Sequence, residues 1–504
     1  MPSQKHAEGH HPPAPTSARE AADRIRSQVP GLAFMGLAFW MAWNTIAFSG
    51  SFWLHDIENS YAAEMLKLVH LAASVVTLST CALTTKRSTR LIIDDRFLVA
   101  GALVASLGTV GIIGSRLPDQ DTALVTFVIS CVLSGAGTTV LFMRATMLFG
   151  SVPPRRAAAL LALCAMLSSG IYFALAGVDE RVANAGFVLL PILAVPFLLL
   201  HGKSSLSKER SLRTDATLTK GIVVFFLSVL LCSGAFEIMR SYALVGIPPS
   251  YAIESVHNSS FIEIVIMLGL VASLLVTEGY RNRFVHLYSG AGALIVLMLV
   301  LIVTISPNTV LTSSIAIAGT SLYNLVIWSM LAYVVYQSQS SSVFVFGLGN
   351  AVLSLGTVVG IVVIMAYHQK LFGDAVMQGL IVFVVASVLL CSLFVFNERR
   401  MDELILPIEE ERAETAVFGE EAKRLPRHWV SECRRIASDH GLSARETEVF
   451  IELARGRSAQ ETADAQVVSI YTVRAHTRAI YAKLEIHSKR ELADLVKRER
   501  EAAR

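Results

Sequence analysis

Long apolar segments separated by short polar ones make up most of the chain as far as residue 397. An α-helix needs about 20 apolar residues to cross the hydrocarbon core of a bilayer. The sequence holds twelve segments of roughly this length, at residues 31–53, 61–83, 97–115, 122–143, 157–176, 185–201, 221–240, 259–277, 285–305, 310–336, 343–367 and 375–397. The pattern therefore predicts an all-α fold in which residues 31–397 form a twelve-helix transmembrane domain.

Glycine spacing and loop charge indicate how this domain is organised. Gly356 and Gly360 are four residues apart in one segment, a spacing that lets membrane helices approach closely. Lys and Arg are retained on the cytoplasmic side of a membrane. With the polar residues 1–30 placed in the cytoplasm, eighteen Lys and Arg fall in inward-facing segments and four in outward-facing ones. With twelve crossings, both termini are predicted to be cytoplasmic.

The polar stretch of residues 202–220 divides the apolar segments into six and six. Twelve helices in two halves, joined by a basic central loop, resemble the major facilitator transporters over about residues 30–397. The family's signature between the second and third helices contains a Gly, an acid and a cluster of Arg and Lys. Here the loop Thr84–Arg96 has no Gly, which argues against transport as the activity.

Composition agrees with a membrane protein and offers no catalytic chemistry. Hydrophobic residues make up 53% of the chain and charged residues 16%, whereas a soluble protein carries roughly 25% charge. The six cysteines form no C-x-x-C pair and no Cys/His cluster with metal spacing, so they are expected to be reduced. The polar N-terminal segment does not resemble a signal peptide. No enzyme signature is present, and no metal or other cofactor is predicted.

After Asn397 the composition changes sharply. Residues 398–425 contain nine acids and five bases, which predicts an acidic linker over 398–426 and a separate domain over 427–504. Within that domain, three helix starts are marked by capping boxes. In a capping box the Ser side chain accepts a hydrogen bond from the backbone N–H of a Glu three residues later, and the Glu side chain accepts one from the Ser backbone N–H. The pairs are Ser443 and Glu446, Ser458 and Glu461, and Ser488 and Glu491.

A fourth helix start, at Ser469, has the N-cap without the Glu. The apolar periodicity then predicts four helices, at residues 443–455, 458–466, 469–484 and 488–500, with Gly456 ending the first. A short helix, a tight turn and a longer helix with a basic face make a helix-turn-helix. The strings SIYTVRAH, KL and HSKREL resemble the LuxR/NarL-type family over about 65 residues.

The resemblance makes residues 469–484 the recognition helix, and it implies bacterial origin and binding to double-stranded DNA, commonly as a dimer. It places Arg474, Ala475 and Arg478 at the major groove, and Thr472, His476, Lys483 and Lys489 near phosphates. Ser469, at the start of this helix, is also a DNA-binding candidate. The residues themselves agree, since Arg474 and Arg478 share a helix face with no acid between Ser469 and Leu484. The sequence departs from the family at Thr462 and Gln466, where aliphatic residues are usual, and at Glu485, where Gly is common.

Polar residues inside the apolar segments are candidates for a ligand site, because intramembrane charges are costly and usually functional. The candidates are Asn44, Glu64, Lys67, His70, Glu237, Arg240, Glu263, Asn324, Trp328 and Asn350. Other interpretations stay open for each group. Glu64 and Lys67 could pair near the outer interface, Glu237 and Arg240 could form an interfacial ion pair, and the tryptophans could simply pack.

Three functional hypotheses follow. The leading one is a one-component transcriptional regulator in the bacterial cytoplasmic membrane, whose transmembrane domain senses an unknown small molecule and whose helix-turn-helix binds promoter DNA. The second is a secondary transporter with an appended regulatory domain, in which Glu64, Glu237 and Glu263 supply a titratable path. The third is a membrane anchor without a ligand, against which the intramembrane charges argue.

Overall fold

The computed structural model describes residues 31–48, 61–115, 120–200, 220–244, 249–276, 309–338, 340–394, 429–466 and 468–502, together with residue 297. The regular secondary structure of these residues is helical, and the chain divides into two compact units, Met1–Met401 and Asp402–Arg504. We describe each unit by itself.

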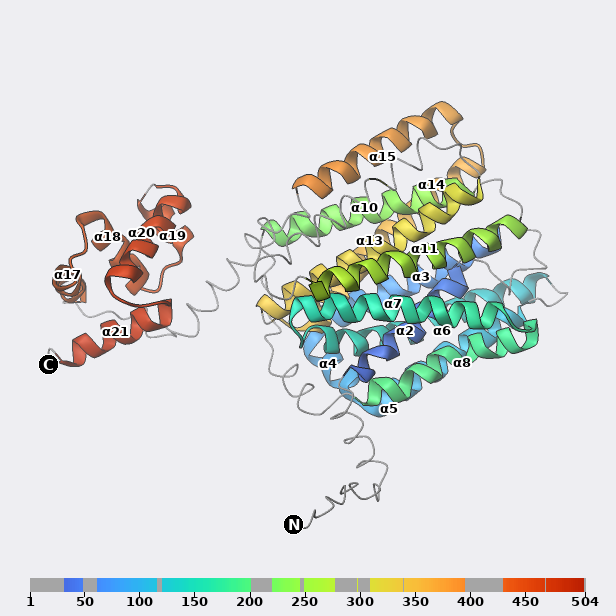
Figure 1. The fold of residues 1–504 in the computed structure, drawn as a ribbon, viewed down its shortest axis with the longest axis horizontal. Coiled ribbons are helices and arrows are strands. Elements are labelled where there is room, and N and C mark those ends of the chain that lie inside the picture. The colour runs from blue at the N-terminus through green and yellow to red at the C-terminus, as the bar shows by residue number, and fades with distance from the viewer. Residues whose placement is uncertain are drawn as a thin grey trace, which may run out of the picture. The chain divides into compact units, whose positions relative to one another are not determined.

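The first unit is a bundle of long helices that run side by side (Figure 1). The described helices are η1 (Leu32–Met35), α2 (Gly36–Phe48), α3 (Tyr61–Leu83), α4 (Thr85–Ile93), α5 (Asp95–Gly114), α6 (Gln120–Phe149), α7 (Pro154–Ala176), α8 (Glu180–Leu199), α10 (Lys220–Leu244), α11 (Pro249–Val276), α13 (Val310–Ser338), α14 (Ser342–His368) and α15 (Asp374–Phe394). Ten of them are long and apolar enough to cross a membrane, and Leu32–Phe48 forms a shorter apolar helix. The chain is therefore a multi-pass membrane protein.

Eleven of the predicted membrane segments coincide with these helices, and the segment predicted at residues 285–305 lies outside the described residues. The helices often extend beyond the apolar run. Helix α11 begins at Pro249, ten residues before the predicted start, and carries Glu254 and His257 in its first turns. Hydropathy detects the part of a helix that faces lipid, while a helix can continue wherever its polar side chains reach water or protein.

Helix α4 was not predicted as a helix, because it is short and carries Lys86, Arg87 and Arg90. The side chain of Arg144, on α6, holds the C-terminal end of α4 in place. This guanidinium is 1% exposed and donates to the carbonyl oxygens of Ile92 (3.0 Å) and Ile93 (2.8 Å) and to Asp95 Oδ1 (2.8 Å). A charged side chain thus satisfies carbonyls that the helix end leaves without partners.

Helices α10 and α14 pack closely through small residues (Figure 1). A Cβ atom placed on Gly360 would lie 2.8 Å from the Gly234 carbonyl oxygen and 2.8 Å from Glu237 Cβ. A Cβ on Gly356 would collide with Ser233 Oγ. The spacing of these two glycines therefore serves the close approach of α14 to α10, as predicted.

The second unit contains α17 (Trp429–Asp439), α18 (Ala444–Ala454), α19 (Ala459–Gln466), α20 (Ile470–Lys483) and α21 (Lys489–Ala502). The last four begin within one residue of their predicted starts, and α17 is an additional helix ahead of them. Both arms of the capping box are present at Ser443 and at Ser458. At Ser488 the hydroxyl caps the Glu491 N–H, but the Glu491 carboxylate accepts from the His487 N–H instead.

The core of this unit is built from its own helices. Cys433 and Ile436 of α17, Phe450 of α18, Val473 of α20 and Leu492 of α21 are among its buried members. At 25 cal/mol per Å² of apolar area, a buried side chain of this size contributes about 1.5–3 kcal/mol.

Two residues at which the sequence departs from the family occupy costly positions. Thr462 is 0% exposed, and its hydroxyl has no hydrogen-bond partner. Glu485, between α20 and α21, has a φ of 55°, a left-handed conformation that favours glycine. A side chain there costs roughly 1–2 kcal/mol. Both residues should lower the stability of the domain.

We expect Gly360→Ala to destabilise the first unit by about 1–3 kcal/mol, because the added methyl group overpacks the contact between α10 and α14. The thermal midpoint of the purified chain in detergent measures this effect. Gly379→Ala is the matched control, since nothing lies within 4 Å of a Cβ at that position. An equal response of the two variants would contradict close packing at Gly360.

We expect Thr462→Val to stabilise residues 427–504 by about 1 kcal/mol, because it removes a buried hydroxyl that has no partner. Urea denaturation of this domain measures the change. Thr447→Val is the control, since the Thr447 hydroxyl donates to the Ser443 carbonyl at 2.8 Å and its loss should bring no gain. Destabilisation by Thr462→Val would show that the hydroxyl is satisfied.

Candidate functional site

Helix α20 presents a basic face outward from the second unit. Val473 and Ile480 are 0% exposed and anchor the helix to the core. On the outward side, Ala475 and Arg478 are exposed and Arg474 is half-buried. The guanidinium groups of Arg474 and Arg478 take part in none of the ion pairs between described residues. Both can therefore reach a ligand without breaking an internal contact.

The other residues predicted to bind DNA have varied surroundings. The Ser469 hydroxyl accepts from the Thr472 N–H at 3.1 Å and caps α20. Thr472 is exposed and His476 half-buried. The sequence analysis missed Tyr471, which is 68% exposed and one turn before Arg474. The i, i+3 spacing of Tyr471 and Arg474 could have identified it.

The two lysines predicted near phosphates make contacts within the domain. Lys483 Nζ lies 2.7 Å from Glu446 Oε2 and 3.2 Å from the Gly441 carbonyl oxygen. The hydrogen bond from Lys483, with that from the Ser443 N–H, lowers the pKa of Glu446 to about 2. Lys489 Nζ donates to the Arg457 carbonyl oxygen at 2.9 Å. These ammonium groups help to hold the helices together in the free protein.

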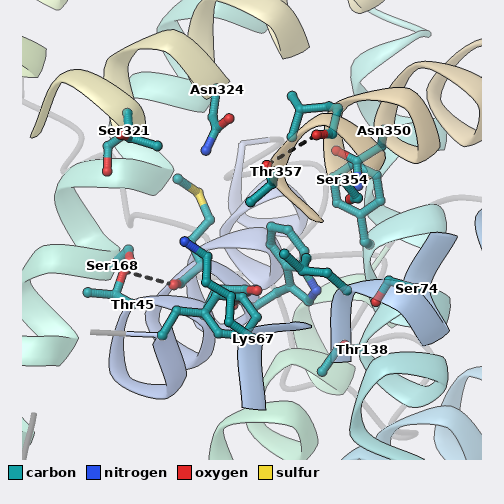
Figure 2. A pocket seen from close by; sticks show the side chains of 18 of the residues that line it. Thr45, Lys67, Ser74, Thr138, Ser168, Ser321, Asn324, Asn350, Ser354 and Thr357 are labelled. Atoms are coloured by element: carbon teal, nitrogen blue, oxygen red, sulfur yellow. Dashed lines mark hydrogen bonds between the residues drawn. The ribbon is translucent and has the colours of Figure 1, made fainter. Parts of the chain in front are cut away.

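The first unit encloses a cavity of about 190 Å³ among its membrane helices, and Figure 2 shows many of its polar lining side chains. Helices α2, α3, α6, α7, α10, α11, α13 and α14 contribute to the lining. Nine of the ten predicted ligand-site residues lie on it: Asn44, Lys67, His70, Glu237, Arg240, Glu263, Asn324, Trp328 and Asn350. Glu64 is not among the lining residues. The structure thus brings together residues that are far apart in the sequence.

The Glu237 carboxylate is the centre of a buried ion-pair cluster. Lys67 Nζ of α3 lies 2.5 Å from Glu237 Oε2, and Arg240 Nη2 lies 2.9 Å from Glu237 Oε1. The Ser241 hydroxyl also donates to Oε1, at 3.0 Å. Glu237 is 1% exposed and Arg240 8%, so their ion pair is buried inside the protein. Breaking such a pair by removing one partner typically costs 3–5 kcal/mol.

Among the predicted neighbours Glu64, Lys67 and His70, the lysine and the histidine have partners on different helices. Lys67 pairs with Glu237, which is 170 residues away in the sequence, and no ion pair joins it to Glu64. His70 is 2% exposed, and its Nδ1 lies 2.9 Å from Ser134 Oγ on α6. The interpretation of Glu64 and Lys67 as an interfacial pair is therefore wrong, because a carboxylate from α10 takes the lysine.

Aromatic rings line another part of the cavity. The ring centroid of Trp40 lies 4.8 Å from that of Phe142 and 5.7 Å from that of Trp328. The indole N–H of Trp328 donates to Asn350 Oδ1 at 3.1 Å. Trp43 instead faces the core, at 0% exposure, and its N–H donates to Thr109. Of the two tryptophans that precede Asn44 on α2, Trp40 thus lines the cavity and Trp43 packs in the core.

Many hydroxyl groups on the cavity wall were not predicted. They come from Thr45, Ser74, Thr138, Thr139, Ser168, Ser259, Ser260, Thr320, Ser321, Ser354 and Thr357. Figure 2 shows Ser168, Ser321 and Asn324 on the cavity wall, with Lys67 extending toward its centre. Ser and Thr are ordinary in membrane helices and often bond the carbonyl four residues earlier. Nothing in one segment distinguishes those that face a cavity.

One comparison with known proteins concerns the second unit. Residues 440–496 match the family described as bacterial regulatory proteins, luxR family. A search of curated proteins found no match to the chain.

The solved structures that resemble the chain include transporters. The E. coli fucose:proton symporter FucP has 12% identity and a TM-score of 0.45, covering 75% of this chain and 98% of its own. A bacterial homologue of the iron transporter ferroportin, in its outward-facing state, has 14% identity and a TM-score of 0.46, covering 74% and 98%. These similarities concern the arrangement of helices and say nothing of what the cavity binds.

The outward basic face of α20, the capped helices around it and the family match lead to one conclusion: residues 440–496 are a helix-turn-helix DNA-binding domain of the bacterial luxR family, carried on a chain with membrane-spanning helices.

Proposed function

We propose that the chain is a membrane-embedded one-component transcriptional regulator. One observation carries the proposal: the same chain has a luxR-family DNA-binding domain and, among its membrane helices, a cavity lined by ion pairs, asparagines and aromatic rings. A domain that served only as an anchor would have no need of buried charges, which are costly in a membrane. The cavity is the place where a small molecule binds.

In this proposal the basic face of α20 reads promoter DNA in the major groove. Arg474 and Arg478 donate to guanine O6 and N7, for which the guanidinium fork is suited, and Ala475 contacts a base edge. Thr472, His476, Lys483 and Lys489 lie near phosphates and position the helix, which Ser469 caps. For Lys483 and Lys489, a phosphate contact adds to or replaces the contacts described above.

The protein acts from the bacterial cytoplasmic membrane with both termini in the cytoplasm. The excess of Lys and Arg in the inward-facing segments, eighteen against four, supports this orientation. Chromosomal DNA is on the same side. Tethering to a membrane raises the effective concentration of a second copy, which favours a dimer on paired half-sites.

The ligand signals by changing the equilibrium between two conformations of the helix bundle. It can do so only by binding one of them more tightly. The Glu237 cluster is suited to this role, because it joins α3 to α10 and lines the cavity. A ligand that competes for Lys67 or Arg240 would weaken that connection, and the linker of residues 398–426 would pass the change to the DNA-binding domain.

The alternative is a secondary transporter whose appended domain gives feedback. It is supported by the two carboxylates on the cavity wall, those of Glu237 and Glu263, which could take part in coupled transport. Glu64, the third member of the suggested titratable path, does not line the cavity. The experiment below separates the two functions.

We expect the double variant Arg474→Ala/Arg478→Ala to lose specific DNA binding while it inserts normally into the membrane. Each bidentate guanine contact discriminates by about 1–3 kcal/mol, so each Arg should cost roughly 5- to 150-fold in affinity. Transcript profiling with a panel of small molecules, together with chromatin occupancy, measures the effect. Arg445→Ala is the control, since Arg445 is an exposed arginine of the same domain, paired with Glu448.

Regulation predicts that a compound induces a small set of genes with the wild type and with Arg445→Ala, and not with the double variant. Wild-type operator occupancy by the double variant would refute the recognition-helix assignment. Identical transcripts, together with accumulation of a compound in cells carrying either version, would favour the transporter.

A further inference from the structure

The charged groups on the cavity wall fall into two sets. Lys67 and Arg240 share the Glu237 carboxylate through short ion pairs, so that two cations contact one anion. Glu64 interacts electrostatically with the two cations of this cluster. The remaining charged side chain of the lining is Glu263, near the middle of α11.

Glu263 has a hydroxyl group as its hydrogen-bond partner. The Ser169 hydroxyl of α7 donates to Glu263 Oε2 at 3.2 Å. Among the described residues, no Lys, Arg or His forms an ion pair with this carboxyl group. Because the residue lines the cavity, the carboxyl group remains accessible to a ligand.

The elements packed against α11 offer no cation for it. Helix α13 contains no basic residue within Val310–Ser338. On α7 both arginines, Arg155 and Arg156, lie in the first turn, far along the helix from Ser169, and the Arg155 guanidinium donates to the Leu274 carbonyl oxygen. His257, on α11 itself, lies against the rings of Tyr172 and Phe173. Nearby described side chains thus leave Glu263 uncompensated.

An isolated carboxylate in a membrane is expensive, whereas one paired with a cation is far less so. A ligand ammonium group would supply that cation and form a charge-assisted hydrogen bond, the strong class of such bonds. The rings of Trp40, Phe142 and Trp328 offer the same ligand an apolar wall, and tryptophan faces also attract cations. The cavity, at about 190 Å³, is smaller than drug-sized pockets of about 300–1,000 Å³.

We propose that the ligand of this cavity is a small organic amine, bound in its protonated form with the ammonium group on Glu263 and the apolar body against Trp40, Phe142 and Trp328. The inference rests on the proposed function, because the cavity is the sensing site there. It adds the charge of the ligand and the residue that recognises it.

The test is thermal stabilisation of the purified full chain in detergent by three probes of one skeleton. The probes are 2-phenylethylamine, 2-phenylethanol and phenylacetate, which differ in carrying a positive, neutral or negative group at neutral pH. Hexylamine and hexanol repeat the comparison without an aromatic ring. We expect the amines to raise the melting temperature of the wild type in a saturable manner, and the alcohols and the acid to have little effect.

Glu263→Gln should weaken amine binding about tenfold or more, since a hydrogen bond to a charged group contributes about 1.5–3 kcal/mol. Glu254→Gln is the matched control, because Glu254 is an exposed residue of the same helix. If Glu263→Gln does not fold, the comparison of amines with alcohols on the wild type still tests whether the cavity prefers a cation. The proposal is overturned if no amine binds, if the alcohols or the acid bind as well as the amines, or if Glu263→Gln binds them like the wild type.

A promoter reporter then separates this inference from the proposed function. Amine binding that depends on Glu263 but leaves operator occupancy unchanged would remove the regulatory proposal and keep the ligand assignment. A reporter that responds only to neutral or acidic compounds would keep regulation and overturn the amine.

Discussion

The carboxylate of Glu237 connects the membrane helices on which the cavity depends. Two cations, Lys67 from α3 and Arg240 from α10, share its two oxygens. This arrangement requires α14 to leave room beside α10, and the bare backbone of Gly360 does so, since a Cβ there would lie 2.8 Å from Glu237 Cβ. The ion pair of Lys67 with Glu237 and the close packing of α14 on α10 therefore constrain the same helix, because a shift of α10 would disrupt both.

The two units stabilise their polar groups in different ways. In the membrane unit the backbone is satisfied within helices, and side-chain charges need partners from other helices, as at Arg144 and Lys67. In the DNA-binding unit, water is available, and local caps at Ser443, Ser458 and Ser469 satisfy the helix ends. Local sequence consequently determines the second unit more completely than the first.

This difference explains which features could be predicted. Caps and periodicity located the starts of α18 to α21 within one residue, and hydropathy located the membrane helices, because both signals are local. The partner of Lys67 could not be predicted, since spacing on α3 suggested Glu64 while the folded chain supplies Glu237. Intramembrane polarity identified most of the cavity residues, but the hydroxyl groups of its wall carry no comparable signal. Helix α4 was not predicted because its amphipathic pattern is short and its basic residues resemble those of a polar loop.

The hydrophobic core of the DNA-binding unit is complete within residues 433–496. A domain that is already folded cannot be switched on by receiving a missing piece of its core from the membrane helices. Completion of this core by a partner is therefore not the mode of control that the proposed function needs. In the regulator proposed above, the signal would then act on geometry: how far the domain can reach along a chromosome and how often two copies meet. Regulation of this kind is expected to act on the rate at which promoters are found.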